Sequence, residues 1–165
     1  SIAGPSLVPL IVSRPPRSPL FGTAAAVTQA VAAGLDACWR EWQNSVRVPG
    51  LPWWPSFVVV PGRETAPMPN VPTPLSALTW NAQSISTDAL VRAMQAKLTM
   101  PLAFSTELFT AIATGFRAAL DLWFPAQMIS NVLGRGAVPT FAPPYVPVGP
   151  VVSGSIIEAP PHFIP

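Results

Sequence analysis

The sequence predicts a mainly α fold: a small helical core of three to four helices, long proline-rich extended arms and loops, and few or no strands. Three observations predict it. Proline occurs 23 times in 165 residues, and most of these prolines gather in three segments. The stretches between those segments carry the apolar spacing of amphipathic helices. Charged residues make up only 10% of the chain, whereas hydrophobic residues make up 50%, and apolar surface in such excess normally meets a partner or a membrane.

The proline distribution also predicts the domain organisation. We expect residues 1–20 and 136–165 to form extended arms, and residues 21–135 to form the helical core, interrupted by a proline-rich loop at 46–80. Proline lacks a backbone N–H and biases the residue before it toward extended geometry. These segments should therefore be irregular or polyproline II, with a short strand at 57–60 and one or two strands from the valines and isoleucines of the C-terminal arm.

The first helix is expected from Thr23 to Asn44, with the Thr23 hydroxyl as its N-cap. Its apolar side chains recur every three or four residues and so share one face: Val27, Val31, Leu35, Cys38 and Trp42. Small residues beside this face, Ala30, Ala33 and Gly34, leave room for a second helix to approach closely. We interpret the segment as an amphipathic core helix; the alternative is a membrane-active helix.

Three further helices are expected, from Thr87 to Leu98, from Ser105 to a break at Pro125, and from 126 to 133, where Gly134 would end the last one. The apolar face expected for the second helix is Leu90, Val91, Met94 and Leu98. That expected for the third helix is Leu108, Ile112, Phe116, Leu120 and Trp123, widened by Phe109 and Ala119. Charges within 105–133 argue against a membrane span, and Arg117 and Asp121 are spaced to form an ion pair.

The residues that carry enzyme chemistry are scarce. The one histidine, His162, stands near the C-terminus without a second histidine or cysteine beside it, and Cys38 is the only cysteine. We interpret Cys38 as a buried inert thiol. No phosphate-binding, dinucleotide-binding or nucleophile-elbow motif occurs, although two distant carboxylates could still meet in the fold as an acid–base pair. We therefore expect no enzyme activity, no catalytic or metal-binding residues and no cofactor.

The basic residues are scattered along the chain, and the net charge is only +2. No run or stripe of lysine and arginine forms the electrostatic footprint of a nucleic-acid-binding surface. We expect no specific nucleic-acid partner. The preference for arginine over lysine suits protein interfaces, and a GC-rich genome is an equally good explanation of it.

Four aromatic residues in the proline-rich segments are candidate anchors for neighbouring subunits: Trp53, Trp54, Phe141 and Tyr145. Large rigid aromatics dominate the energetics of protein interfaces. Trp53 and Trp54 stand between Pro52 and Pro55, on a stiff extended scaffold. The alternative is that the two tryptophans fold back onto the helices of this chain.

In its layout the chain resembles small accessory structural proteins of phage and virus particles and of phage-tail-like assemblies. The resemblance lies in the arrangement of proline-rich arms around a small helical core along the whole chain, and it rests on no single motif or family. It implies a non-catalytic structural subunit of a large assembly, a virion component of a capsid, tail or baseplate, whose proline-rich arms lace neighbouring subunits together. The partners would be other protein subunits of the particle, including copies of itself.

The expected location is a virion or other large particle that is assembled in the cytoplasm, because the chain shows no signal peptide and no clear transmembrane span. The alternative is a membrane-associated structural subunit of a membrane complex or of a membrane-containing virus. In that case the apolar helices would contact the membrane surface.

Overall fold

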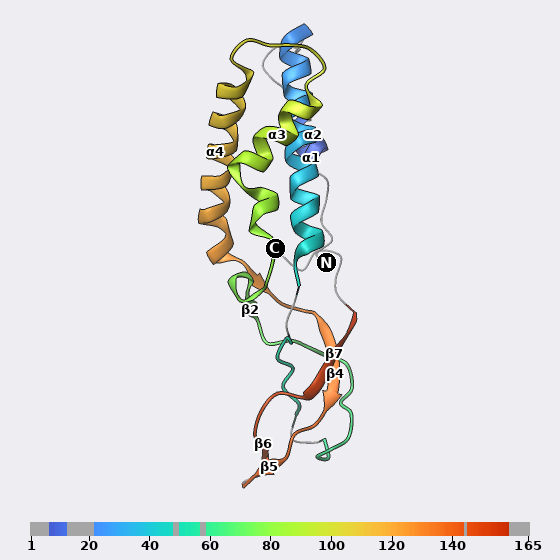
Figure 1. Ribbon diagram of the computed structural model, residues 1–165. Helices are drawn as coiled ribbons and strands as arrows, with labels where there is room; N and C mark the ends of the chain where they lie inside the picture. Colours follow the sequence, from blue (N-terminus) through green and yellow to red (C-terminus); the bar gives the residue numbers. More distant parts are fainter. Residues whose placement is uncertain (1–6, 13–21, 48–49, 57–58, 144, 159–165) are drawn as a thin grey trace. The chain divides into compact units, whose positions relative to one another are not determined.

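The computed structural model describes residues 7–12, 22–47, 50–56, 59–143 and 145–158 (Figure 1). The chain divides into two compact units. A helical unit comprises Ser1–Arg47 and Trp80–Trp123, and a strand unit comprises Val48–Thr79 and Phe124–Pro165. Each unit is therefore built from two separate stretches of sequence.

The helical unit contains four α-helices within the described residues: α1 (Leu7–Val12), α2 (Gly22–Ser45), α3 (Thr87–Lys97) and α4 (Ser105–Trp123), with a 3-10 turn, η2 (Ala82–Ile85), before α3. Helix α3 packs against both α2 and α4, and α1 packs against α2 (Figure 1). The helices predicted at 23–44 and 87–98 are confirmed to within one residue at each end. The third predicted helix is also confirmed, and it ends at Trp123, two residues before Pro125.

The core of the helical unit is one cluster of buried side chains from α2, α3 and α4: Ala30, Leu35, Cys38, Leu90, Met94, Phe109 and Ala113. Gly34 marks the closest approach of α2 and α3, because a Cβ at Gly34 would lie only 2.6 Å from the backbone nitrogen of Met94. This confirms the prediction that a second helix packs closely at this point of α2. A side chain at Gly34 would force the two backbones apart.

Four tryptophans pack together elsewhere in the helical unit. Trp39 stacks on Trp42 with ring centroids 4.6 Å apart, and edge contacts join Trp39 to Trp123 and Trp42 to Trp80. These contacts join α2 to the last residue of α4 and to the segment before η2. Aromatic pairs contribute stabilising free energy beyond that of their buried area. The cluster therefore holds the helices together at the end of the core that α2, α3 and α4 share.

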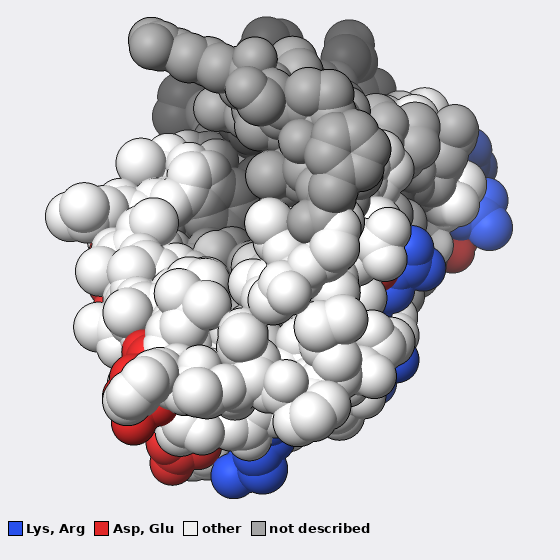
Figure 2. Space-filling view, turned by 90° about the horizontal axis from the view of Figure 1, so that it is seen from above, with Lys and Arg blue, Asp and Glu red and all other residues white. Residues whose placement is uncertain are grey.

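Charged side chains are sparse where the view from above shows described residues. Most of the described residues visible on this face are uncharged, and the lysines, arginines, aspartates and glutamates among them lie toward its margin (Figure 2). Within the described residues, no helix combines the length and the apolar character needed to cross a bilayer.

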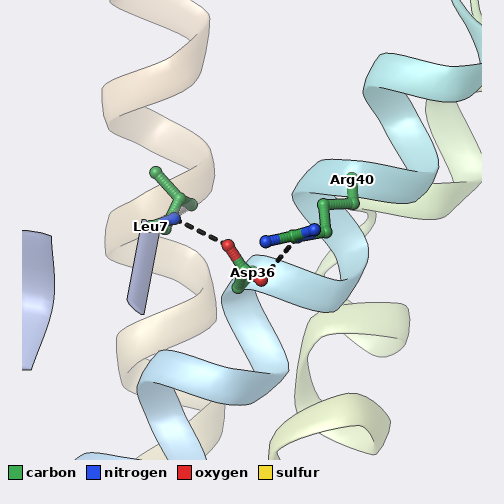
Figure 3. Close-up of polar contacts among 3 residues, drawn as sticks. All are labelled: Leu7, Asp36 and Arg40. Atoms are coloured by element: carbon green, nitrogen blue, oxygen red, sulfur yellow. Dashed lines mark hydrogen bonds and ion pairs between the residues drawn. The ribbon is translucent and has the colours of Figure 1, made fainter. Parts of the chain in front are cut away.

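One buried carboxylate, that of Asp36, connects α1 to α2 (Figure 3). Its two oxygens accept hydrogen bonds from the Leu7 backbone N–H at 2.6 Å and from the Arg40 Nε at 2.8 Å. Leu7 is the first residue of α1, where the backbone N–H has no partner within the helix. Asp36 therefore satisfies a helix-terminal donor and pairs with Arg40 one turn away.

The strand unit contains seven strands within the described residues, and all pairs are antiparallel. The strands are β1 (Met68–Pro69), β2 (Thr73–Pro74), β3 (Met128–Ile129), β4 (Leu133–Ala137), β5 (Phe141–Ala142), β6 (Val146–Pro147) and β7 (Val152–Glu158). They form a three-stranded sheet in the order β1-β4-β7 and two pairs, β2–β3 and β5–β6. Two 3-10 turns, η1 (Leu75–Ala77) and η3 (Phe124–Ala126), complete the unit.

The prediction of a mainly α fold with few or no strands is wrong, because the chain is a mixed α and β protein. Three strands, β1, β2 and β6, consist of two residues that include a proline, and proline predicts loop rather than strand. Strand β4 contains Gly134 and Gly136, so its sequence is typical of a turn. The helix predicted at 126–133 is likewise wrong, since β3 and the start of β4 lie there.

Other predictions for the proline-rich segments have mixed outcomes. Within the expected N-terminal arm, residues 7–12 form α1, and the rest lies outside the described residues. The expected C-terminal arm begins inside β4, and its described residues, up to 158, belong to the strand unit. Of the strand expected at 57–60, residues 57 and 58 lie outside the described residues, and residues 59 and 60 are not in a strand.

We predict that Asp36→Ala lowers the free energy of unfolding by about 1–3 kcal/mol, because it removes a charged acceptor shared by two donors. The matched control is Asp121→Ala, which breaks an Asp–Arg pair of the same spacing on the exposed surface. That loss should stay below about 0.5 kcal/mol. Urea denaturation measures both, and equal losses would contradict the role assigned to Asp36.

Candidate interaction surfaces

The described residues offer little catalytic chemistry. No three histidine, cysteine, aspartate or glutamate side chains among them could hold a metal ion together, and His162 lies outside the described residues. The predicted burial of Cys38 is confirmed. Burial, with a smaller contribution from the charge of Glu41, raises the pKa of the Cys38 thiol, so the reactive thiolate is disfavoured.

An open pocket lies between α2, η2 and α3, and its lining includes Cys38, Glu41, Ser84 and Arg92. The Ser84 hydroxyl donates to the Asn81 carbonyl at 2.8 Å, and Cys38 is held as a thiol. The pocket therefore contains two potential nucleophiles, neither of which is activated.

The four predicted anchor residues have different surroundings, and all belong to the strand unit. Trp54 is 51% exposed and Tyr145 is 77% exposed, whereas Phe141 is half-buried. Trp53 is 1% exposed, so it packs within this chain, against strands rather than the helices considered from sequence. The role of the other three in contacts between subunits stays a prediction.

Trp53 is the central side chain of the strand unit. Its indole N–H donates to the Val132 carbonyl at 3.0 Å, and its backbone carbonyl accepts from the Val151 N–H at 2.8 Å. Its ring lies against Gly134 of β4 and Gly154 of β7, and a Cβ at either glycine would overlap the indole. Gly134, which contributed to the misreading of β4 as a turn, is therefore one of the two glycines that make room for the tryptophan.

Tyr145 is exposed and also held in an unfavourable backbone conformation. It is the last of the three residues that connect β5 to β6, and its φ of 72° lies in the left-handed region. Three-residue hairpin loops commonly place glycine there, because a bulky side chain is an outlier at positive φ. Its neighbours Val146 and Val148 are exposed as well, so the hairpin presents an apolar tip.

Phe104, in the helical unit, is a second exposed aromatic residue in a left-handed backbone conformation. It precedes the first residue of α4, has a φ of 60° and is 79% exposed. Sequence reasoning missed Phe104. The available signal was the absence of charged residues from Leu98 to Thr106. An uncharged connection between two helices indicates a segment that contacts a partner or a membrane.

Helix α4 carries a second apolar face opposite its buried one. Its core side is formed by Phe109, Ala113 and Leu120. The side turned away from α3 consists of Leu108, Ala111, Gly115, Ala118, Ala119 and Leu122, all exposed. We call these six residues the outer face of α4. Leu108 and Ala119 were predicted to belong to the core stripe and are instead exposed, whereas Phe109, which was expected to widen that stripe, lies in the core.

The three-stranded sheet has two dissimilar edges. Strand β1 ends in Pro69, which has no backbone N–H to donate, so a further strand pairs poorly at that edge. Strand β7 forms the other edge, and its side chains from Val152 to Ile157 are all exposed. Two irregularities interrupt the pairing of β7 with β4. Such bulges make an edge a poorer template for a further strand.

Comparisons of this chain with protein-family models, with curated proteins and with solved structures find no match. Its function must therefore follow from its own residues. The distinguishing features of this chain are the exposed apolar side chains of its two units and two exposed aromatic residues held at positive φ, Phe104 and Tyr145.

We predict that Gly134→Ala lowers the free energy of unfolding by about 1–3 kcal/mol or more, because the new methyl group overlaps the Trp53 ring. Gly149→Ala is the control, since a Cβ at Gly149 meets no atom within 4 Å. Tryptophan fluorescence during urea denaturation reports both variants. A neutral Gly134→Ala would show that Trp53 does not pack between the glycines.

Proposed function

We propose that this chain is a non-catalytic structural subunit of a large assembly, and that a virion is the best candidate for that assembly. The observation that carries the proposal is Tyr145, a bulky aromatic that is exposed and held at positive φ at the tip of an apolar hairpin.

The placement of Tyr145 lowers the free energy of unfolding of the isolated chain in two ways. The left-handed conformation costs a residue with a Cβ about 1–2 kcal/mol, and exposing the ring forgoes the free energy of burying it. Among the described residues, Tyr145 makes one backbone hydrogen bond, to Ala142, which any residue could make. Strained residues of this kind gather at binding sites. A partner that buries the ring would offset both costs.

The charge content supports an assembled rather than a freely diffusing protein. Charged residues make up 10% of the chain, compared with about 25% in soluble globular domains. Exposed large apolar side chains occur in both units. A chain with two such units could bridge neighbours, as accessory proteins of phage and virus particles do. The partners would be other protein subunits, including copies of this chain.

A membrane-associated structural subunit is the second candidate. The connection between α3 and α4 favours it, since residues 98–104 carry no charge and expose Met100 and Phe104. Such a loop could insert into the interfacial region of a bilayer. Flotation of the purified chain with anionic lipid vesicles separates the two candidates, because a subunit held only by proteins stays at the bottom of the gradient.

We predict that the purified chain sediments as species larger than its 17.4 kDa monomer and that Tyr145→Asn reduces the largest species. Asparagine tolerates positive φ, so this variant should keep or slightly raise the free energy of unfolding. Tyr145→Phe keeps the ring and is the matched control, with sedimentation close to that of the original chain.

Analytical ultracentrifugation over a range of concentrations makes the measurement. A chain that is monomeric at every concentration would overturn the proposal. Assembly of Tyr145→Asn to the same extent as the original chain would remove the observation on which the proposal rests.

A further inference from the structure

We infer that the open pocket between α2, η2 and α3 binds a small zwitterion, of the class of a free amino acid with an aliphatic side chain. The ligand carboxylate pairs with Arg92, and the ligand ammonium group pairs with Glu41. All lining residues of the pocket belong to the helical unit. The inference goes beyond the proposed structural role and does not depend on it.

The walls of the pocket are held by contacts that need no ligand. Helices α2 and α3 approach each other closely at Gly34 and Met94. The turn η2 is tied to α2, because the Asn81 backbone N–H donates to the Ser45 hydroxyl at 3.0 Å. It is tied to α3 through Ser86, which ends η2 and caps α3. The pocket is therefore formed before a ligand arrives, as small-molecule sites usually are.

The size of the pocket suits a small ligand. Its volume is about 390 Å³. Ligand pockets in proteins span about 300–1,000 Å³, so this one lies toward the lower end of that range. A molecule as large as a nucleotide or a peptide helix would not be enclosed, whereas an amino acid would contact several walls at once.

Two charges of opposite sign line the pocket from different helices, Glu41 from α2 and Arg92 from α3. Both act on the thiol of Cys38 in the same lining: the charge of Glu41 raises its pKa and that of Arg92 lowers it. Among the described residues, no ion pair joins Glu41 and Arg92 to each other. Arg92 also forms none with Asp88, one helical turn before it. Both charges therefore remain available to a ligand.

This pair of charges selects the class of ligand. A simple anion that approaches Arg92 also meets the negative charge of Glu41, and a simple cation meets the reverse arrangement. A molecule that carries both a carboxylate and an ammonium group avoids both repulsions. It also gains two charge-assisted hydrogen-bonding contacts, which are about twice as strong as neutral ones.

The remaining lining residues fit the rest of an aliphatic amino acid. The side-chain amide of Gln83 makes no hydrogen bond with another described residue and can donate to the ligand carboxylate. The Ser84 hydroxyl donates to the Asn81 carbonyl, so its lone pairs can accept from the ligand ammonium group. Small apolar side chains leave room for the aliphatic part: Ala37, Ala89 and Ala93.

Other segments of the chain match the two charges poorly. Outside the described residues, the charged side chains are Arg14 and Arg17, which bring no carboxylate for Arg92. In the strand unit, the Glu64 carboxylate is already paired with Arg135. A segment of this chain that nevertheless filled the pocket would exclude the ligand, and the experiments below detect that outcome.

The first experiment titrates the full chain at neutral pH with valine and with its two single-charge analogues. The analogue 3-methylbutanoate keeps the carboxylate, and 2-methylpropylamine keeps the ammonium group. The backbone amide shifts of Ala89 and Arg92 in NMR spectra report binding. Valine should bind with a Kd of about 1 mM or tighter, and each analogue should bind about tenfold more weakly or worse. Absence of valine binding, or equal binding of the three compounds, would overturn the inference.

The second experiment removes the charges one at a time. Glu41 and Arg92 are both exposed, so Glu41→Gln and Arg92→Gln should fold, and each should weaken valine binding about tenfold or more. Glu41→Gln should bind 3-methylbutanoate better than the original chain does, because the repulsion is gone. The matched controls are Glu107→Gln and Lys97→Gln, which remove the same charges from exposed positions outside the pocket and should leave valine binding unchanged.

Urea denaturation without ligand detects an occupant from the same chain. If another segment already pairs with these charges, Glu41→Gln or Arg92→Gln destabilises the fold more than its control does, and the inference is wrong. Equal stabilities support an unoccupied site.

A third experiment fills the pocket without changing its charge. Ala37 is exposed in the structure, and leucine is nearly as good a helix former as alanine. Ala37→Leu should therefore fold and should abolish valine binding. Ala96→Leu, at an exposed position of α3 outside the pocket, is the control and should bind valine normally. Unchanged valine binding by Ala37→Leu would show that the ligand does not occupy this pocket.

These results are separable from those for the proposed function. A chain that stays monomeric but binds valine through Glu41 and Arg92 would lose the proposed assembly role and keep this site. A chain that assembles but fails to bind valine would lose only the site.

Discussion

The close approach of α2 and α3 at Gly34 is the contact on which the helical unit depends. The Met94 backbone occupies the space that a side chain at Gly34 would need. This approach brings Leu90 and Met94 into the core, where Phe109 and Ala113 of α4 join them. Helix α4 contributes one side to that core, and Leu108, Gly115 and Leu122 on its other side are exposed.

Two glycines in long helices have different surroundings. Gly34 is enclosed by this chain, and its lack of a side chain is explained within the helical unit. A Cβ at Gly115 would meet no atom within 4 Å, so packing among the described residues does not require this glycine. Phe104 and Tyr145 are each exposed and held at positive φ.

The sequence predicted the helices well because their evidence is local. The spacing of Leu35, Cys38 and Trp42 involves residues within a few turns of one another. The two faces of α4 were not separated, since a helix that is apolar on both sides has no unique core stripe. The Asp36–Leu7 contact joins residues 29 apart, and no local pattern reports it.

The one or two strands expected from the valines and isoleucines of the C-terminal arm are confirmed as β6 and β7, but the other strands were missed. Proline in β1 and β2 and glycine in β4 predict loops, and the position of Trp53 explains Gly134 only in the structure. Trp53 was proposed as an anchor for a neighbour, and it instead holds Gly134 and Gly154 against its own ring. Tyr145 was selected for its aromatic character, but its positive φ, which is the stronger argument, is visible only in the structure.

The most direct measurement of this account is the free energy of unfolding of Gly34→Ala and Gly115→Ala in dilute solution. The account predicts a loss of about 1–3 kcal/mol for Gly34→Ala, because the methyl group meets the Met94 backbone. It predicts a gain of up to about 1 kcal/mol for Gly115→Ala, because alanine favours the helix and meets nothing. A neutral Gly34→Ala, or a loss at Gly115→Ala, would contradict the distinction between a glycine that the helix packing requires and a glycine that it does not require.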